Sequence, residues 1–271
     1  MVNEPDAPTV PAPLPLPRRL AELVAVRHGL SEANVVFEQA KADGITDAVL
    51  DGSDTDVPLS ATGVAQATAL GAWLARTRAG TGTGPRLDLV LCSPYRRARD
   101  TWEAMRREAA RLGHAPDVPL LIDERLRDRE MGVFELHTPA AIRSRAPAEA
   151  ERRARLGDWL YRPPGGESLA DVALRVRTLL AELDAAAPGK RVLVVAHDAV
   201  VVCLRHAIDG IGAPVPPGGV AVVPNASVTR WHGDGTRLRL AEFGSTAHLD
   251  RTPPGGLPTT GREPNGPPRP I

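Results

Sequence analysis

Two histidines and two arginines in this chain each follow closely on a short apolar run. These residues are Arg27, His28, Arg97 and His197. In an open parallel sheet, ligands bind beyond the carboxyl ends of the strands, so strands over these runs would bring the side chains to one crevice. Positive side chains repel one another unless an anion lies between them, and arginine binds phosphate well. The spacing therefore predicts a phosphate site that contains two histidines.

The hydrophobic pattern predicts the elements that must position these side chains. Strands are expected over 20–26, 87–92, 192–196, 227–231 and 238–243, and helices over 61–76, 96–112, 168–186 and 200–208. Ser168, with Asp171 three positions later, is typical of the capping box that begins a helix. Alternating strands and helices predict an α/β fold, a three-layer α/β/α sandwich around a mainly parallel sheet that is covered on both faces.

The composition is that of a neutral protein. The 271 residues include 33 Lys and Arg and 33 Asp and Glu, so the formal net charge is zero, which argues against general binding of nucleic acid or of a membrane surface. Cys92 and Cys203 lie in apolar runs and are expected to be buried free thiols. With no signal-peptide pattern and no apolar stretch long enough to span a membrane, a cytoplasmic protein is expected.

Proline-rich stretches flank the alternating region. Residues 1–18 have a polyproline-like pattern, and residues 250–271 are rich in proline and glycine. Both are predicted to be disordered tails. One domain is therefore expected over residues 19–249.

The run Arg27-His28-Gly29, followed by Ser31 and Asn34, resembles the signature of the histidine phosphatase superfamily, the phosphoglycerate mutase-like branch 1. Six further segments resemble that branch in the same order, at 59–67, 93–101, 126–132, 165–169, 192–197 and 225–227. A single short motif is a weak signal, whereas a series in the right order is specific. The resemblance covers residues 20–245 and implies the phosphoglycerate mutase-like form of the three-layer fold.

The resemblance also implies a role for each matching residue. His28 would attack phosphorus and become a phosphohistidine, and Asp128 would protonate the leaving oxygen and then activate water. The phosphoryl oxygens would be held by a set of polar residues, namely Arg27, Ser31, Asn34, Arg97 and His197. The flanking arginine charges should lower the pKa of His28 and keep it unprotonated for attack. No cofactor and no metal is expected, and the partner would be a small-molecule phosphate ester.

Four carboxylates leave questions open. Asp128 stands where the branch usually has Glu, and Glu130 is a rival for the role of the acid, although Asp128 is preferred. Glu167, in the segment Gly-Glu-Ser-Leu, is a further possible site residue. Asp198 follows His197 where glycine is usual, and it is expected to turn away from the site and cap a helix that begins at Ala199.

The stretch 35–57 is longer than the usual spacing and rich in aspartate, with Asp43, Asp47, Asp51, Asp54 and Asp56. It is expected to form either a lid that disfavours highly anionic substrates or a solvated surface insertion.

Among the other histidines, His137 could touch substrate, but a structural position is preferred. Surface positions are expected for His114, His232 and His248, and a helix-end position for His206.

The preferred function is a phosphatase that hydrolyses phosphomonoesters. One alternative is a phosphotransferase of the phosphoglycerate mutase type, and another is a catalytically weak pseudo-phosphatase that binds phosphorylated ligands. Residues 51–59 lack the Gly-Trp-x-Asp stretch of the mutases, which favours hydrolysis over transfer. The sequence carries no motif that names the substrate, the pathway or the oligomeric state.

Overall fold

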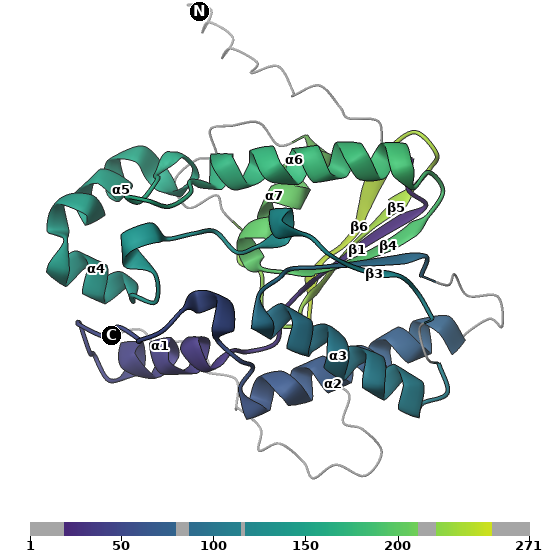
Figure 1. The fold of residues 1–271 in the computed structure, drawn as a ribbon, viewed down its shortest axis with the longest axis horizontal. Coiled ribbons are helices and arrows are strands. Elements are labelled where there is room, and N and C mark those ends of the chain that lie inside the picture. Colours follow the sequence, from purple (N-terminus) through teal and green to yellow (C-terminus); the bar gives the residue numbers. More distant parts are fainter. Residues whose placement is uncertain (1–18, 80–86, 115–116, 211–220, 251–271) are drawn as a thin grey trace, which may run out of the picture.

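The computed structural model describes residues 19–79, 87–114, 117–210 and 221–250 (Figure 1). Its strands are β1 (Glu22–Arg27), β2 (Leu89–Cys92), β3 (Leu120–Ile122), β4 (Arg191–Ala196), β5 (Val228–Gly233) and β6 (Leu238–Ser245). Its α-helices are α1 (Glu32–Ala42), α2 (Ala61–Ala79), α3 (Arg96–Arg111), α4 (Pro139–Arg145), α5 (Pro147–Leu160), α6 (Leu169–Ala186) and α7 (Asp198–Asp209). Three 3₁₀ turns, η1 (Asp54–Asp56), η2 (Glu124–Leu126) and η3 (Gly132–Phe134), lie in the connections. Apart from Asp250, the two predicted tails lie outside the described residues.

The strands form one six-stranded sheet in the order β3-β2-β4-β1-β5-β6. The pairs β1–β4, β2–β4 and β2–β3 are parallel, whereas β5 is antiparallel to both β1 and β6. Only β5 therefore runs against the other strands, and the predicted mainly parallel sheet is confirmed. The central strands β1 and β4 are continuous apolar runs, as expected for strands buried on both faces.

Helices cover both faces of this sheet, so the predicted three layers are confirmed. In Figure 1, α6 and α7 lie on one side of the sheet, and α2 and α3 lie on the other. Alternate residues of β1 enter the two cores, Leu23 and Ala25 with α6 and α7, and Val24 and Val26 with α2 and α3. This alternation follows from the two-residue period of a strand.

The strand register aligns the residues that carry chemistry. Arg27 of β1 pairs with Ala196 of β4, and Cys92 of β2 pairs with Val195 of β4. The residues that directly follow these three strands therefore lie close together at the carboxyl edge of the sheet, where the parallel strands end. Helices α1, α4 and α5 gather beyond that edge, at the left in Figure 1.

Several elements were not predicted, namely α1, α4, α5 and β3. Helix α1 begins at a capping box in which Ser31 caps the helix and Asn34 replaces the usual Glu or Gln, so the common signal is missing. Strand β3 has only three residues and lies at the sheet edge, too short for a periodic pattern.

The surface position predicted for His248 is wrong, because its side chain is only 5% exposed. Residues 246–249 form a turn in which Leu249 donates to the carbonyl of Thr246, and Leu249 packs against the core on the α2 and α3 side. The sequence around His248 leads into a proline-rich stretch, so its pattern did not predict that the chain packs against the core here.

Both cysteines are buried and free, as predicted. Burial raises the pKa of the Cys92 thiol, and likewise that of the Cys203 thiol, to about 12. Among the described helices, none is both long and apolar enough to cross a membrane.

Candidate active site

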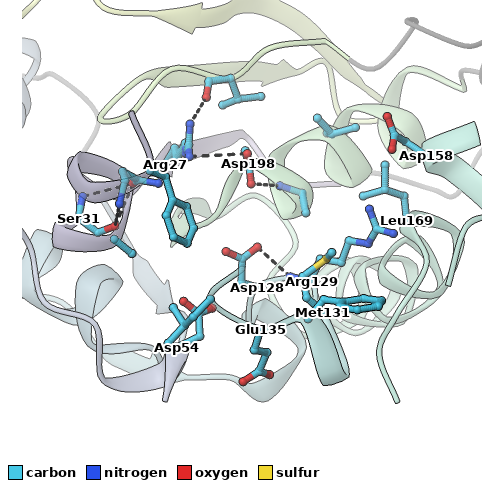
Figure 2. Close-up of a pocket in the computed structure, with 18 of the residues that line it drawn as sticks. Arg27, Ser31, Asp54, Asp128, Arg129, Met131, Glu135, Asp158, Leu169 and Asp198 are labelled. Carbon is cyan, nitrogen blue, oxygen red and sulfur yellow. Dashed lines mark hydrogen bonds and ion pairs between the residues drawn. The ribbon is translucent and has the colours of Figure 1, made fainter. Parts of the chain in front are cut away.

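The predicted histidines meet at the carboxyl edge of the sheet. His28 follows β1 and His197 follows β4, both rings are buried, and their centroids lie 5.1 Å apart. A cavity of about 510 Å³ opens beside them, and Arg27, Asn34, Arg97 and Asp128 line it. Figure 2 shows the carboxylates of Asp54, Asp128 and Glu135 around this hollow.

Hydrogen bonds fix the orientation and the tautomer of His28. Its Nδ1 lies 2.7 Å from the carbonyl oxygen of Gly29, and its Nε2 lies 3.2 Å from Nε of Arg97. A carbonyl only accepts and a guanidinium only donates, so Nδ1 carries the hydrogen and Nε2 keeps a lone pair. The lone pair of a neutral imidazole is what a nucleophilic histidine needs.

The pKa of His28 lies well below its usual value. Burial is the largest cause, followed by the neighbouring His197, Arg97 and Arg27, all of which disfavour a second positive charge. The lowering expected from the flanking arginines is present, although desolvation contributes more than the charges.

His197 is held by a serine that the sequence did not assign to the site. Its Nε2 lies 2.8 Å from Oγ of Ser93, and that oxygen also accepts from the backbone N–H of Tyr95. The Ser93 hydroxyl hydrogen is thus available to Nε2, which places the ring hydrogen of a neutral His197 on Nδ1. Among the described residues, this buried Nδ1 has no partner with hydrogen-bond geometry, although Oδ2 of Asp128 lies 3.2 Å away. An unpaired buried donor at this point suits a phosphoryl oxygen.

Arg97 lies at the centre of the site and is only 4% exposed. Its Nη2 donates to Oδ2 of Asp128 at 2.8 Å. Both Nη1 and Nη2 donate to the carboxylate of Asp54, at 3.0 Å each. Asp54 lies in η1, within the acidic stretch, so part of that stretch reaches the site.

The rival carboxylates are separated by the structure. Asp128 contacts Arg97 and lies beside His197, whereas Glu130 pairs with Arg127 at 2.7 Å. Burial raises the pKa of Asp128, but the neighbouring His197, Arg97 and His28 outweigh burial and hold that pKa well below its usual value. In this environment the ionised form of Asp128 is therefore favoured.

Glu167 is not brought into the cavity. It pairs with Arg127 at 2.7 Å and with Arg175 at 2.9 Å. Arg175 in turn donates to the backbone carbonyl of Asp128 at 3.0 Å. Glu167 thus supports the segment that carries Asp128 and does not contact a ligand position.

Ser31 and Asn34 line the cavity at the start of α1. The Ser31 hydroxyl donates to Oδ1 of Asn34 at 3.0 Å and accepts from its backbone N–H. Asn225, in the family-like segment 225–227, also donates to this Oδ1, at 3.3 Å. With Oδ1 occupied, the Asn34 amide nitrogen is left to donate to a ligand.

Two contacts hold the side chain of Arg27 beside the cavity. Its Nη1 donates to the carbonyl of Val223 at 2.6 Å, and its Nη2 lies 3.6 Å from Oδ2 of Asp198. The expectation that Asp198 turns away is wrong, because its side chain faces the cavity toward Arg27 (Figure 2). It does accept from the Ala199 N–H, but Asp198 is the first residue of α7 and His197 is the N-cap.

Two glycines allow the chain to fold tightly next to His28. A Cβ on Gly29 would lie 2.5 Å from the carbonyl oxygen of Gly63, and a Cβ on Gly63 would lie 2.1 Å from that of Leu30. The loop after β1 and the first turn of α2 therefore approach backbone to backbone. Because an added side chain would collide with the opposite backbone, both segments carry glycine at this point.

His28, Asp128 and His197 each bring one possible ligand atom within 4.8 Å of the others, a spacing that could hold a metal ion. Arg97, however, donates to both His28 and Asp128. A guanidinium in that place repels a cation and attracts an anion, so the donor set fits a phosphoryl group better than a metal.

The sequence did not assign several residues that contribute to the site. Ser93 directly follows β2, so the signal that found His197 could also have found it. The wall of the cavity also includes Arg129, Arg153 and Asp158, together with His137, which the sequence offered as a possible substrate contact. Arg153 and Asp158 lie in α5 and Arg129 lies in a loop without a periodic pattern, so no sequence signal points to these three residues.

The fold and the site define an α/β enzyme that handles phosphoryl groups, and comparisons with known proteins agree. The family model described as histidine phosphatase superfamily (branch 1) matches residues 23–246. Glucosyl-3-phosphoglycerate phosphatase of Mycobacterium tuberculosis is 32% identical over 198 residues, 70% of this chain and 76% of that protein. The 2,3-bisphosphoglycerate-dependent phosphoglycerate mutase 2 of Gloeobacter violaceus is 31% identical over 203 residues, again 70% and 76%.

A solved structure shows the same fold. The mycobacterial glucosyl-3-phosphoglycerate phosphatase in complex with VO3 matches with a TM-score of 0.64 and 29% identity, over 83% of this chain and all of that one. The chain belongs to branch 1 of the histidine phosphatase superfamily. It is a phosphatase, and a histidine-based mechanism is typical of its family.

Proposed function

We propose that the protein hydrolyses small phosphomonoesters through a phosphohistidine on His28. The observation that carries the proposal is the lone pair on Nε2 of His28, which the Nδ1–H to Gly29 contact fixes toward Arg97, a residue that lines the cavity. Arg27, Arg97, Asn34 and the Nδ1–H of His197 would hold the phosphoryl oxygens. Such donors stabilise the charge that develops on those oxygens in the transition state.

The reaction has two steps. In the first, Nε2 of His28 forms a bond to phosphorus, the bond from phosphorus to the ester oxygen breaks, and protonated Asp128 gives that oxygen its proton. In the second, Asp128 takes a proton from water, the resulting oxygen attacks phosphorus, and the bond from phosphorus to His28 breaks. Inorganic phosphate leaves, and His28 is neutral again.

Asp128 must acquire its proton when substrate binds, because its protein neighbours alone favour the ionised form. A phosphoryl group that takes over the contacts of Asp128 with Arg97 and His197 weakens the interactions that lower the pKa of Asp128. The negative charge of that group also raises the pKa of a neighbouring carboxyl. Binding of the ester therefore prepares the acid.

The cavity favours an ester whose alcohol is larger than a few atoms. Its volume of about 510 Å³ lies within the range of small-molecule sites and exceeds what a phosphoryl group needs. Apolar side chains form part of its wall, among them Phe37, Met131, Phe134 and Leu169. Arg129, which donates to the backbone carbonyls of Tyr161 and Glu167, adds positive charge there.

The names of the relatives support a small phosphorylated substrate, since one is a glucosyl-3-phosphoglycerate phosphatase and another a phosphoglycerate mutase.

We also propose that the enzyme acts in the cytoplasm. The two buried free thiols support this location, because free cysteines suit a reducing compartment.

The test compares wild type with His28→Ala, Asp128→Asn and Glu130→Gln in the presence of a chelator. Released phosphate is measured with 4-nitrophenyl phosphate and with glycerol 2-phosphate. His28→Ala should be inactive on both. Asp128→Asn should lose at least about a hundredfold in kcat on the alkyl ester, and less on the aryl ester, whose leaving oxygen needs little protonation.

Glu130→Gln is the matched control, because it removes the same charge two residues away, and its activity should stay near wild type. Activity that survives in His28→Ala would refute the proposed nucleophile. A larger loss in Glu130→Gln than in Asp128→Asn would refute the proposed acid.

A further inference from the structure

All five N–H groups of Arg97 are engaged by the protein itself. Nε donates to His28, and Nη2 donates to Asp128 and to Oδ2 of Asp54. Nη1 donates to the side chain of Asp54 at 3.0 Å and to its backbone carbonyl at 2.6 Å. A guanidinium has five N–H donors, so none is left for a phosphoryl oxygen.

The contact between Arg97 and Asp54 has the form of a phosphate contact. Two carboxylate oxygens face two guanidinium nitrogens, the bidentate arrangement that arginine also makes with phosphate. A ligand that binds Arg97 in this way needs the donors that Asp54 occupies. Asp128 holds fewer of these donors, and its other oxygen accepts from the Arg129 N–H at 2.8 Å.

We propose that Asp54 competes with the phosphoryl group for Arg97, and that a ligand must displace this carboxylate to bind. The inference rests on the proposed function, since it assumes that Arg97 holds the phosphoryl group. Asp54 thereby weakens the binding of every phosphoryl ligand, including the product phosphate, which must leave before the next turnover.

Few hydrogen bonds join the turn that carries Asp54 to other segments of the fold. Before it, the Leu50 N–H donates to the carbonyl of Leu136, and after it, the carbonyl of Pro58 accepts from the Glu32 N–H. Within the described part of the chain, the hydrogen bonds between residues 51–57 and other segments all join Asp54 to Arg97. Release of this one pair frees the turn between its two anchors.

The test is the dissociation constant for inorganic phosphate, measured by isothermal titration calorimetry at fixed pH and ionic strength. Asp54→Asn and Asp54→Ala should each bind phosphate at least about tenfold more tightly than wild type, because each removes the competing charge. The KM for 4-nitrophenyl phosphate should fall in parallel, and phosphate should inhibit more strongly. Asp56→Asn is the matched control, since it removes the same charge from the same exposed turn and should bind like wild type.

Binding that is unchanged or weaker in Asp54→Ala would overturn the inference, because it would mean that Asp54 holds Arg97 in place for the ligand. Tighter binding of the same size in Asp56→Asn would also overturn it, since general charge would then be the cause. If wild type hydrolyses esters and His28→Ala does not, either result refutes this inference alone. Failure of wild type and both Asp54 variants to bind phosphate would refute the proposed function as well.

Discussion

The two ring nitrogens of His28 have different hydrogen-bonding roles. Nδ1 donates to the carbonyl of Gly29 and fixes the ring, which leaves the lone pair of Nε2 toward Arg97 and the cavity. Burial and three neighbouring cationic or titratable groups keep the ring neutral. Under the proposed function, the same arginine that disfavours protonation of His28 would bind the anion that His28 attacks.

This environment predicts an unusual titration for His28. An unperturbed histidine is half protonated near pH 6.5, whereas His28 should remain neutral there and titrate at lower pH, because its pKa is lowered by burial first and by His197, Arg97 and Arg27 next. NMR titration of the imidazole signals measures this directly, with His28 assigned by the signal missing in His28→Ala. A midpoint at or above about 6.5 would contradict the described environment.

At the scale of elements, the close approach of Gly29 and Gly63 brings α2 against the loop that carries His28. The N–H of Gly29 also donates to Oγ1 of Thr101 in α3 at 3.1 Å, and the N–H of Leu30 donates to the side chain of Gln66 in α2 at 2.8 Å. The catalytic loop is thus fixed by two helices and not by the strand alone.

Gly63→Ala should therefore lower both stability and activity. The added Cβ would lie 2.1 Å from the Leu30 carbonyl oxygen, so the helix and the loop must separate. We expect a loss of about 1–3 kcal/mol in the free energy of unfolding in urea, and a fall in kcat because His28 shifts.

Ala65→Gly is the control for this helix, since residue 65 is exposed. It should cost about 1 kcal/mol through helix propensity and leave kcat unchanged. A Gly63→Ala variant that is more stable than wild type and fully active would show that the contact does not constrain the site.

At the scale of the whole molecule, the sheet and its layers could be predicted because burial on both faces produces continuous apolar runs. Strands β1 and β4 are such runs, and their shared register brings His28 and His197 together. The site residues at strand ends were therefore within reach of the sequence, and the resemblance to the family added Asp128 and Asn34.

The rest of the site depends on loop conformation, which leaves no periodic signal. The acidic stretch was recognised, but which of its aspartates meets Arg97 follows from the turn η1 alone. Asp198 was expected to turn away, because the sequence does not show that Arg27 lies within 3.6 Å of its carboxylate. Glu167 was a possible site residue, but its pairing with Arg127 and Arg175 became visible only in three dimensions.

The central claim is that catalysis passes through a covalent phosphohistidine on His28. The most direct measurement is to mix the enzyme with an aryl phosphate, quench in alkali, where phosphohistidine survives, and locate the phosphoryl group by peptide mass spectrometry. We predict the modification on His28, its absence in His28→Ala, and its accumulation in Asp128→Asn, where water is no longer activated. Turnover in wild type without a phosphorylated His28, or with the phosphoryl group on another residue, would contradict the account.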